Sequence, residues 1–569
     1  MTKNTYPRVA AVLMWLLPLL LIVPNVALDI TEMSYSAWAR ITNVFLPLGL
    51  YLLAAAWGPR IGRKILFFIP VMVLCAFQIV LLFLYGESII AIDMFLNVLT
   101  TNVHEAGELL INLGPAILTV LALYLPLIFA GIWAAARGAR IPARVMALGR
   151  RVSVLALLIG LVSFGLAFTS PGGYRPLRQL FPANVVSNMF SAVDRSAISS
   201  AYPEASASYR FNALDADSIA ADSAQIVVVV IGETSRSNHW SLGGYGRPTT
   251  PRLSSCSNLV FFPKALSESN TTHKSVPLML SHLTASEFGD SAYVAGSIVD
   301  AFNEAGYSTA WISNQAHNHS LIDYYSQRAG HMEYICDDTI PHNETVQDTE
   351  LALRLGKLIE AKPTGKLFVV LHTYGSHFNY KERYTAEDTR FTPDDDVSAN
   401  SANRDQLVNA YDNSVLATDR ALDSIIEVLR RSSRPSVLVY ASDHGEDIFD
   451  DSRNRFLHAS PSPTYYQIHV PMLVWLSDSY ASVHPDCLAA LEANRNKNVS
   501  SSESMFHTVA SLAGISVPVL DQSLALSSRS YREPERRYLN DYDESVPLKD
   551  SGLHPEDFDK LNERHISID

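Results

Sequence analysis

The sequence predicts a chain in two parts: an N-terminal bundle of five transmembrane helices and a C-terminal α/β domain with a mainly parallel central sheet. Three observations predict this fold class. The first 170 residues contain five long apolar stretches, whereas the remainder has the composition of an acidic soluble protein. In that remainder, continuous runs of β-branched residues alternate with helical patterns, which is typical of parallel strands covered by helices. The length of 569 residues also exceeds that of one ordinary domain.

Each apolar stretch is long enough, or nearly so, to cross a hydrocarbon core about 30 Å thick. The five run over Val9–Leu28, Val44–Trp57, Ile65–Tyr85, Ile117–Ala136 and Val152–Phe168, and the second is the weakest because it is short. Further spans follow the first stretch without an obvious small-residue cleavage site, so we expect it to stay in the protein rather than act as a cleavable signal peptide.

Basic residues predict the orientation of the bundle, because short loops rich in Lys and Arg stay in the cytoplasm. Such loops separate spans two and three, and spans four and five; their basic residues are Arg60, Arg63, Lys64, Arg137, Arg140, Arg144, Arg150 and Arg151. The connection 86–114 contains no Lys or Arg. We therefore expect the N-terminus inside and the C-terminal domain outside, which leaves Arg40 alone among the outer inter-span loops.

The connection 86–114 has both ends on the outer side, and we expect it to form amphipathic helices on the membrane surface. It contains Asn102, Glu105 and Glu108, and the two glutamates share one helical face because they are three residues apart. Two interpretations stay open. The carboxylates form a solvated acidic face, or they face the ammonium group of a lipid headgroup.

Composition also sets the expected domain limits. Residues 1–170 form the transmembrane domain, and residues 171–223, rich in Ser, Ala and Pro, form a linker with helices along the membrane surface. Residues 224–569 form the soluble domain. The net charge of −13 argues against a nucleic-acid partner.

The four cysteines are too few for a disulfide scaffold. They show no Cys-x-x-Cys spacing, which argues against a cysteine zinc site. One disulfide among Cys256, Cys336 and Cys487 stays open, because the sequence alone does not choose the pair.

Three buried strands of the soluble domain end in chemically active residues. The apolar runs Gln225–Ile231, Lys366–Leu371 and Ser436–Ala441 read as strands, separated by helical patterns such as 346–360 and 409–430. Gly-Glu-Thr follows the first strand, the segment His372–His377 follows the second, and Ser-Asp-His-Gly-Glu follows the third. Ligands bind beyond the carboxyl ends of strands in open α/β sheets, so three such endings indicate one constructed site.

The residue types at these strand ends indicate a metal. Glu233, Asp443 and His444 offer carboxylate and imidazole ligands without cysteine, which is a shell for zinc or a manganese-type ion. Gly445 permits the turn that lets the adjacent Asp and His converge. The alternative role for Asp443 is a helix cap or turn residue. A bound metal would hold a phosphoryl oxygen and lower the pKa of a coordinated hydroxyl.

The nucleophile is expected on the loop between the first and second of these strands. The segment 267–277 contains four hydroxyl residues, Ser269, Thr271, Thr272 and Ser275, which chemistry alone does not separate. A hydroxyl is a poor nucleophile at neutral pH and needs a metal or a base beside it.

At this point the motifs resemble a known family. The segment Ile231–Leu253, the Tyr-Gly-Ser-His segment and the Ser-Asp-His-Gly-Glu run, in this order, are similar to the membrane phosphoethanolamine transferases. These enzymes act on lipopolysaccharide and belong to the alkaline phosphatase/sulfatase superfamily. The resemblance covers nearly the whole chain. It implies a multi-pass protein of the bacterial inner membrane, a monomer, with a sulfatase-like catalytic domain at 224–569 in the periplasm.

The resemblance also implies roles for the strand-end residues. Glu233, Asp443 and His444 match zinc ligands, so Zn²⁺ is the expected cofactor. Thr272, five residues before Pro277, matches the nucleophilic threonine that lies close to zinc.

The remaining implied positions are substrate contacts. His377 and His458 match histidines that contact the phosphoryl group or a second metal. Asn102, Glu105 and Glu108 resemble the lipid-headgroup segment, in a looser alignment.

The resemblance implies a two-step transfer. Thr272 attacks the phosphorus of phosphatidylethanolamine, diacylglycerol leaves, and the phosphoethanolamine then passes from the threonine to lipopolysaccharide. Cysteines that flank the nucleophile loop in lipid A-specific members are absent here, where Glu268 and Leu278 stand. Trp311–Gln315 and Asp541–Glu544 resemble instead the branch that modifies core heptose. A core sugar is therefore favoured over lipid A, and resistance to cationic antimicrobial peptides is a hypothesis from the family.

Other functions stay open within the same superfamily. A glycerophosphate transferase or a phosphodiesterase would share the fold, but Glu105 and Glu108 suit an ammonium headgroup better than glycerol. A sulfatase would need a Cys or Ser in a Cys/Ser-x-Pro-x-Arg setting, which does not occur near the first strand. A membrane scaffold without activity would require the Glu, Asp and His at three strand ends to be coincidence.

Overall fold

The computed structural model describes residues 6–31, 35–86, 88–100, 113–215, 225–338 and 346–568. The chain divides into two compact units. The first consists of Met1–Phe95, Leu110–Val193 and Asp451–Arg455, and the second of Leu96–Leu109, Asp194–Asp450 and Phe456–Asp569.

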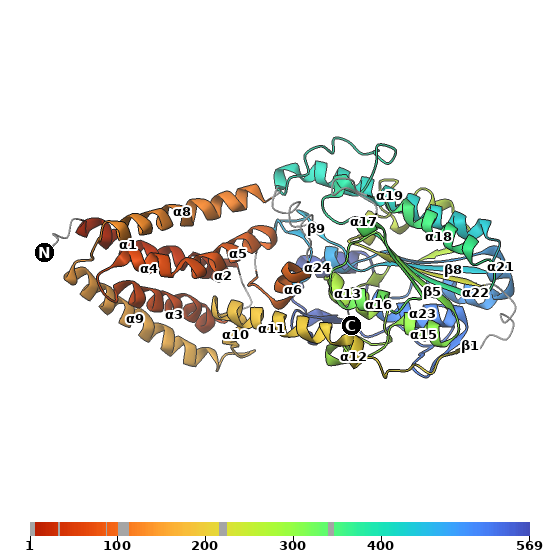
Figure 1. Cartoon of the computed structure of the whole chain (residues 1–569), viewed down its shortest axis with the longest axis horizontal. Helices are drawn as coiled ribbons and strands as arrows, with labels where there is room; N and C mark the ends of the chain where they lie inside the picture. Colours follow the sequence, from red (N-terminus) through yellow and green to blue (C-terminus); the bar gives the residue numbers. More distant parts are fainter. Residues whose placement is uncertain are drawn as a thin grey trace. The chain divides into compact units, whose positions relative to one another are not determined.

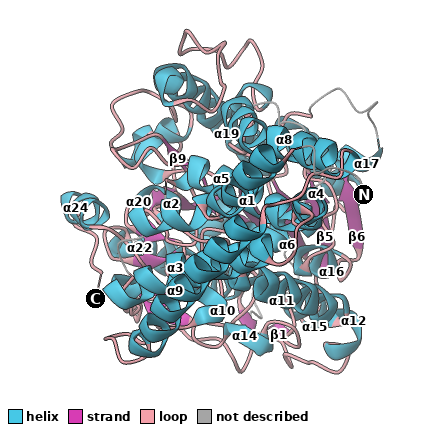
Figure 2. Cartoon of the chain, turned by 90° about the vertical axis from the view of Figure 1, so that its left-hand side faces the viewer, coloured by secondary structure: helices cyan, strands magenta, loops and turns pink. Residues whose placement is uncertain are grey.

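Throughout its described residues, the first unit consists of helices and loops without a strand (Figure 2, helices in cyan). Its helices are α1 (Pro7–Leu21), α2 (Val23–Thr31), α3 (Ala37–Ala56), α4 (Ile61–Phe67), α5 (Ile69–Tyr85), α8 (Gly114–Ala136), α9 (Ala143–Ala167), α10 (Pro176–Gln179) and most of α11 (Ala183–Ser200). Helix α6 (Ile92–Thr100) begins in this unit.

In the part of the chain that the structure describes, four helical stretches are long and apolar enough to cross a membrane: α1 with α2 (Pro7–Thr31), α3, α8 and α9. The number rises to five if the bent pair α4–α5 is one span. The predicted five-span bundle agrees with the larger count. The weakest predicted span, Val44–Trp57, belongs to α3, which begins seven residues earlier, at Ala37. The apolar pattern does not extend over this first part of α3 because Arg40, Thr42 and Asn43 interrupt it. In the structure the Thr42 hydroxyl bonds Ser163 at 3.0 Å, and the Asn43 amide donates to Gln179 O at 2.7 Å.

Glycines allow the membrane helices to approach closely. A Cβ atom on Gly62 of α4 would lie 2.3 Å from the backbone nitrogen of Ala135 in α8. A Cβ on Gly160 of α9 would lie 2.7 Å from the Cα of Leu46 in α3. Because lipid tails are as apolar as the helix surfaces, such close backbone packing is a main source of helix association in membranes.

The second unit is built on a seven-stranded sheet in the order β3-β11-β8-β2-β7-β5-β6. The strands are β2 (Ile226–Gly232), β3 (Leu259–Phe261), β5 (Ser308–Ser313), β6 (His331–Tyr334), β7 (Leu367–His372), β8 (Ser436–Ser442) and β11 (Met472–Leu476). The five strands β8, β2, β7, β5 and β6 run parallel. Strand β11 is antiparallel to β8, and β3 pairs antiparallel with β11, so β3 runs in the same direction as the five. The predicted mainly parallel sheet is confirmed, and its three predicted strands are β2, β7 and β8.

Helices cover both faces of the sheet (Figure 1). Helices α18 (Thr349–Ala361) and α19 (Arg404–Arg431) lie on one face, and α15 (Ile298–Glu304) and α23 (Ser501–Ala513) lie on the other. Phe302 of α15 stacks on Phe368 of β7 with ring centroids 3.8 Å apart. Burial on both faces explains why the three central strands are continuous apolar runs.

The remaining helices and strands are short, and they connect the elements of this core or lie at its edges. The helices are α12 (Tyr202–Ala205), α13 (Thr272–Met279), α14 (Phe288–Ser291), α16 (Leu321–Ser326), α17 (Ile335–Asp338), α20 (Tyr465–Ile468), α21 (Asp478–Val483), α22 (Pro485–Asn494) and α24 (Pro555–Glu563). The strands are β1 (Leu214–Asp215), β4 (Ala265–Leu266), β9 (Asp447–Ile448), β10 (Phe456–Leu457), β12 (Val499–Ser500), β13 (Ile515–Ser516), β14 (Arg537–Leu539) and β15 (Ser545–Pro547). No disulfide joins any of the four cysteines, all of which lie within the described residues.

The close crossing of α4 and α8 yields a prediction with opposite signs at two glycines. Alanine favours a helix over glycine by about 1 kcal/mol. At Gly62 the added methyl meets backbone atoms of α8, and overpacking of this kind destabilises by about 1–3 kcal/mol. Gly165 of α9 has no atom within 4 Å of the added Cβ. We expect Gly62→Ala to lower the melting temperature of the detergent-solubilised protein and Gly165→Ala to leave it unchanged or raise it. Equal shifts in the two variants would contradict the close crossing.

Candidate metal and nucleophile centre

The register of the sheet brings the ends of β2 and β8 together. Gly232, the last residue of β2, pairs with Ser442, the last residue of β8, so the next residues of both strands are neighbours. The Asp443 amide donates to Gly232 O at 3.1 Å, which continues the ladder past the strand ends. Glu233 and Asp443 therefore leave the sheet side by side at its carboxyl edge, where open α/β folds bind ligands.

Glu233, Asp443 and His444 form a cluster that could hold a metal ion. One ligand atom from each lies within 4.8 Å of the other two. His444 Nε2 is 3.2 Å from Asp443 Oδ2 and 3.6 Å from Glu233 Oε1, and all three side chains are buried. In the described parts of the chain, no other group of three such side chains meets this geometry.

The electrostatics of this cluster fit a cation. Burial, followed by the neighbouring charge of Asp443, raises the pKa of Glu233 well above its usual value, and burial raises the pKa of Asp443 to about 7. Burial lowers the pKa of His444 well below its usual value, which keeps the ring in the neutral form that binds metals. Asp443 Oδ2 has no hydrogen-bond partner within the protein. A divalent cation would relieve the repulsion between the carboxylates and satisfy this oxygen.

Thr272 is the one of the four candidate hydroxyls that contacts the cluster. Its Oγ1 lies 3.1 Å from His444 Nε2 and 3.5 Å from each oxygen of Glu233. Thr271 instead faces the Ser269 hydroxyl at 3.2 Å, and the Ser275 hydroxyl donates to Ser269 O at 3.1 Å. Geometry thus separates hydroxyls that residue chemistry alone left equal, and it singles out the same threonine that the family resemblance implied.

The loop that carries the candidate hydroxyls is tied directly to the end of β8. The Ser267 hydroxyl donates to the backbone oxygen of Asp443 at 2.6 Å. Thr272 follows five residues later, as the first residue of α13. This contact fixes the start of the loop against the end of β8, so Thr272 and Asp443 are positioned together.

His377 and His458 lie beside the cluster. The rings of His444 and His458 have centroids 4.1 Å apart, and those of His377 and His458 are 6.0 Å apart. Burial lowers the pKa of His377 to about 3. His458 Nδ1 is 3.3 Å from Glu446 Oε2, and Glu446 in turn accepts a hydrogen bond from the Tyr380 hydroxyl.

The structure therefore brings six of the nine sequence-predicted site residues together: Glu233, Thr272, His377, Asp443, His444 and His458. Asn102, Glu105 and Glu108 lie outside the described residues.

Sequence reasoning missed the residues that position the loop after β7. Gly375 has φ of +56°, and a Cβ atom there would lie 2.4 Å from Glu233 O. The backbone amides of Tyr374 and Gly375 donate to the half-buried carboxylate of Asp348 at 2.8 and 2.9 Å. Tyr-Gly-Ser-His was a visible signal for Gly375. Asp348 gave none, because an acidic residue before a helix is ordinarily a cap.

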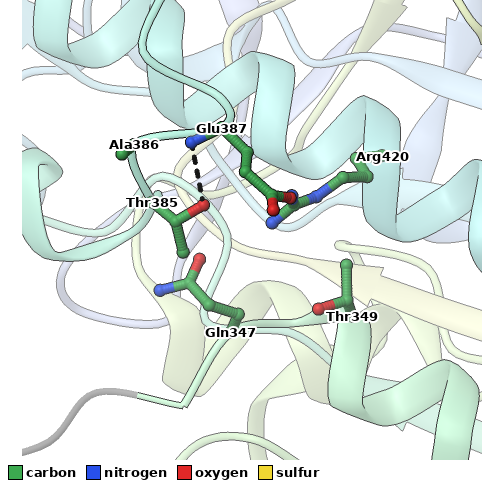
Figure 3. Close-up of a pocket in the computed structure, with 6 residues that line it drawn as sticks. All are labelled: Gln347, Thr349, Thr385, Ala386, Glu387 and Arg420. Carbon is green, nitrogen blue, oxygen red and sulfur yellow. Dashed lines mark hydrogen bonds and ion pairs between the residues drawn. The ribbon is translucent and has the colours of Figure 1, made fainter.

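The described residues also line a surface pocket of about 580 Å³, built from Gln347, Thr349, Thr385, Ala386, Glu387 and Arg420. Figure 3 shows Arg420 and Glu387 pointing toward each other across it, and their ion pair is 2.7 Å long. None of the six site residues that the structure describes lines this pocket, so it is separate from the cluster.

Comparison with known proteins identifies the family of the domain that carries this cluster. The sequence model described as Sulfatase matches residues 225–515, from the first residue of the predicted strand through the strand ends that carry the cluster. The chain belongs to the sulfatase family. This match bears out the superfamily that the motifs indicated.

Within the sulfatase family, the similar curated proteins are phosphoethanolamine transferases. Phosphoethanolamine transferase EptA of Salmonella typhimurium is 30% identical over 318 residues, which cover 52% of this chain and 54% of that protein. Phosphoethanolamine transferase EptC of Escherichia coli K12 is 26% identical over 328 residues, covering 56% and 55%. The matched region thus spans about half the length of these relatives.

Solved structures extend the comparison to the fold. The zinc complex of the C-terminal periplasmic domain of Escherichia coli EptC is 25% identical, with a TM-score of 0.52, and covers 58% of this chain and 96% of that one. The integral membrane protein EptA of Neisseria meningitidis has a TM-score of 0.71 over 93% of this chain and 99% of that one. At 21% identity this second likeness shows the fold alone, with both its membrane and soluble parts.

The contact between Gly375 and Glu233 predicts that a side chain added at position 375 weakens metal binding, whereas one added at position 365 does not. Alanine at either Gly375 or Gly365 meets the same left-handed backbone, at about 1–2 kcal/mol, because φ is +56° and +82°. A Cβ at Gly365 has no atom within 4 Å, whereas one at Gly375 displaces Glu233. We expect Gly375→Ala to weaken divalent-metal affinity about 10- to 100-fold in chelator competition. Gly365→Ala is the control, and equal affinities in both variants would contradict the positioning role.

Proposed function

We propose that this chain is a zinc-dependent phosphoethanolamine transferase that moves phosphoethanolamine from phosphatidylethanolamine to lipopolysaccharide. The observation that carries the proposal is the Thr272 hydroxyl, 3.1 Å from His444 Nε2 and beside the Glu233 carboxylate. The chain is a multi-pass protein of the bacterial inner membrane with its catalytic domain in the periplasm. A donor lipid and a lipopolysaccharide acceptor are both accessible from that side.

Zinc is the metal that the donor set favours. Two carboxylates and one imidazole nitrogen from Glu233, Asp443 and His444 match known zinc shells, and the zinc complex of the similar EptC domain supports the choice. Thr272 is proposed as the further ligand. When bound, zinc supplies a Lewis acid for a phosphoryl oxygen and lowers the pKa of the threonine hydroxyl.

In the first step, Thr272 Oγ1 attacks the phosphorus of phosphatidylethanolamine. The new Oγ1–P bond forms as the bond from phosphorus to the diacylglycerol oxygen breaks. That oxygen leaves with the electron pair and takes up one proton, which balances the proton that Thr272 loses. His377 and His458 contact the phosphoryl oxygens, where charge develops and where fixed polar groups stabilise the transition state.

In the second step, an acceptor hydroxyl or phosphate oxygen on lipopolysaccharide attacks the phosphorus of the phosphothreonine. The new bond from the acceptor oxygen to phosphorus forms as the Oγ1–P bond breaks, and Oγ1 takes up the proton that the acceptor loses, which restores Thr272. The acceptor is a core heptose or lipid A. Asn102, Glu105 and Glu108 are proposed to face the ammonium of the headgroup. The transferred group carries one negative phosphate charge and one positive ammonium charge, so its addition to a lipid A phosphate makes that phosphate site less negative. This is the proposed basis of resistance to cationic peptides.

The covalent step predicts a mass change. We expect the full-length wild-type protein, incubated with phosphatidylethanolamine micelles, to gain one phosphoethanolamine adduct in intact-protein mass spectrometry, and Thr272→Ala to gain none. Thr271→Ala is the matched control and should keep the adduct, because its hydroxyl faces Ser269.

Each other outcome of this experiment has a definite meaning. An adduct that persists in Thr272→Ala and is lost in Thr271→Ala would move the nucleophile. A glycerophosphate adduct from phosphatidylglycerol would replace the donor. Diacylglycerol release without transfer would indicate a phosphodiesterase.

Zinc ligation predicts a residue-specific loss of metal. We expect His444→Ala to lose most of the zinc that the wild-type protein retains after dialysis, as measured by elemental analysis. His469→Ala is the control, since His469 is also buried but its Nε2 contacts the backbone oxygen of Pro263 instead. Equal zinc in the two variants would exclude His444 as a ligand.

A further inference from the structure

The side chain of Gln315 bridges three neighbouring strand ends. Gln315 lies two residues after β5, Thr373 directly follows β7, and Glu233 directly follows β2. These strands are adjacent in the order β2-β7-β5. Gln315 Nε2 donates to Thr373 O at 2.8 Å and to Glu233 Oε2 at 3.0 Å. The amide therefore reaches across the whole of β7 to touch the carboxylate.

This arrangement uses the full donor capacity of the amide nitrogen. A side-chain amide carries two N–H bonds, and one goes to each acceptor. The bond to Thr373 O fixes where the nitrogen lies, because Thr373 is held by its own amide and hydroxyl, which donate to Ile231 O at 3.0 and 2.9 Å. Ser313 and Gln315 are joined as well, since the backbone N–H of Gln315 donates to the Ser313 hydroxyl oxygen at 3.1 Å. The side chain of Gln315 is thus fixed by the bond from its nitrogen to Thr373 O, and its backbone is fixed by the bond to Ser313.

Both oxygens of Glu233 are held by separate donors. Oε1 accepts from the Thr234 hydroxyl at 2.7 Å, and Oε2 accepts from Gln315. Two donors on opposite oxygens fix the rotation of the carboxylate plane. Each oxygen still has a lone pair for a metal or for the Thr272 hydroxyl, which lies 3.5 Å from both.

We propose that Gln315 is a positioning residue that orients the Glu233 carboxylate for zinc. It acts through Glu233 and rests on the zinc-dependent transfer proposed above. A neutral amide suits this role, because it donates to the carboxylate without adding a positive charge that would compete with the cation. Donors to metal-ligating groups typically contribute 10- to 100-fold to metal affinity.

The test measures zinc affinity of the full-length protein in detergent by chelator competition. Gln315→Met keeps the length and removes both donors, and Gln315→Asn keeps the amide but withdraws it by one methylene. We expect both to bind zinc about 10- to 100-fold more weakly. Gln406→Met is the matched control, because that amide lies on α19 and accepts from the Asp396 backbone.

Adduct formation gives a second readout that a purely structural role would not produce. In both Gln315 variants, formation of the phosphoethanolamine adduct should be slow at limiting zinc and return toward the wild-type rate at saturating zinc. The melting temperature of the zinc-free protein should stay close to that of the wild type.

Three outcomes would overturn the inference. These are zinc affinities within twofold of wild type, an adduct rate that saturating zinc does not restore, or failure of both variants to fold, which would make the amide a structural tie. The proposed function is tested separately by the wild type. If the wild type neither binds zinc nor forms the adduct, that function fails, whereas normal wild-type behaviour with unaffected variants removes only the role of Gln315.

Discussion

The soluble unit depends on one electrostatic constraint, the repulsion between two buried carboxylates at the edge of the sheet. Glu233 and Asp443 leave adjacent parallel strands, and burial disfavours charge on both. Their neighbours lower this penalty with hydrogen bonds from Thr234, Gln315 and the backbone of His444. The charge repulsion that these hydrogen bonds leave between the two carboxylates is the reason that the site suits a cation. The same cation is proposed to activate the hydroxyl of Thr272.

Around this constraint, the loops are arranged to keep the carboxylates in place. The loop after β7 packs against the backbone of Glu233, which requires glycine at position 375 and a carboxylate at Asp348 to bind the loop amides. On the other side, Ser267 ties the nucleophile loop to Asp443. The membrane unit follows a different rule. Its helices associate through small residues such as Gly62 and Gly160, because hydrophobic burial does not distinguish a neighbouring helix from lipid.

Local patterns predicted most of the fold. Continuous apolar runs identified β2, β7 and β8 because these strands are buried on both faces. The pattern failed at the start of α3, where Thr42 and Asn43 are polar yet buried. Their partners lie on distant segments, at Ser163 and Gln179, so no window of sequence around α3 contains the reason for their burial.

The sequence by itself determined which chemical groups this protein carries at its strand ends, because strand, turn and ligand are contiguous in the chain. It thereby indicated a metal, the loop of the nucleophile and the family. Residue chemistry left Thr272, Thr271, Ser269 and Ser275 equal, and within the sequence only the family resemblance favoured Thr272. The tertiary structure gave the physical reason, since the fold turns the Thr272 hydroxyl toward His444 and the neighbouring hydroxyls toward Ser269. It also decided the role of Gln315, whose contact with Glu233 exists because β5, β7 and β2 are neighbours in space and not in sequence.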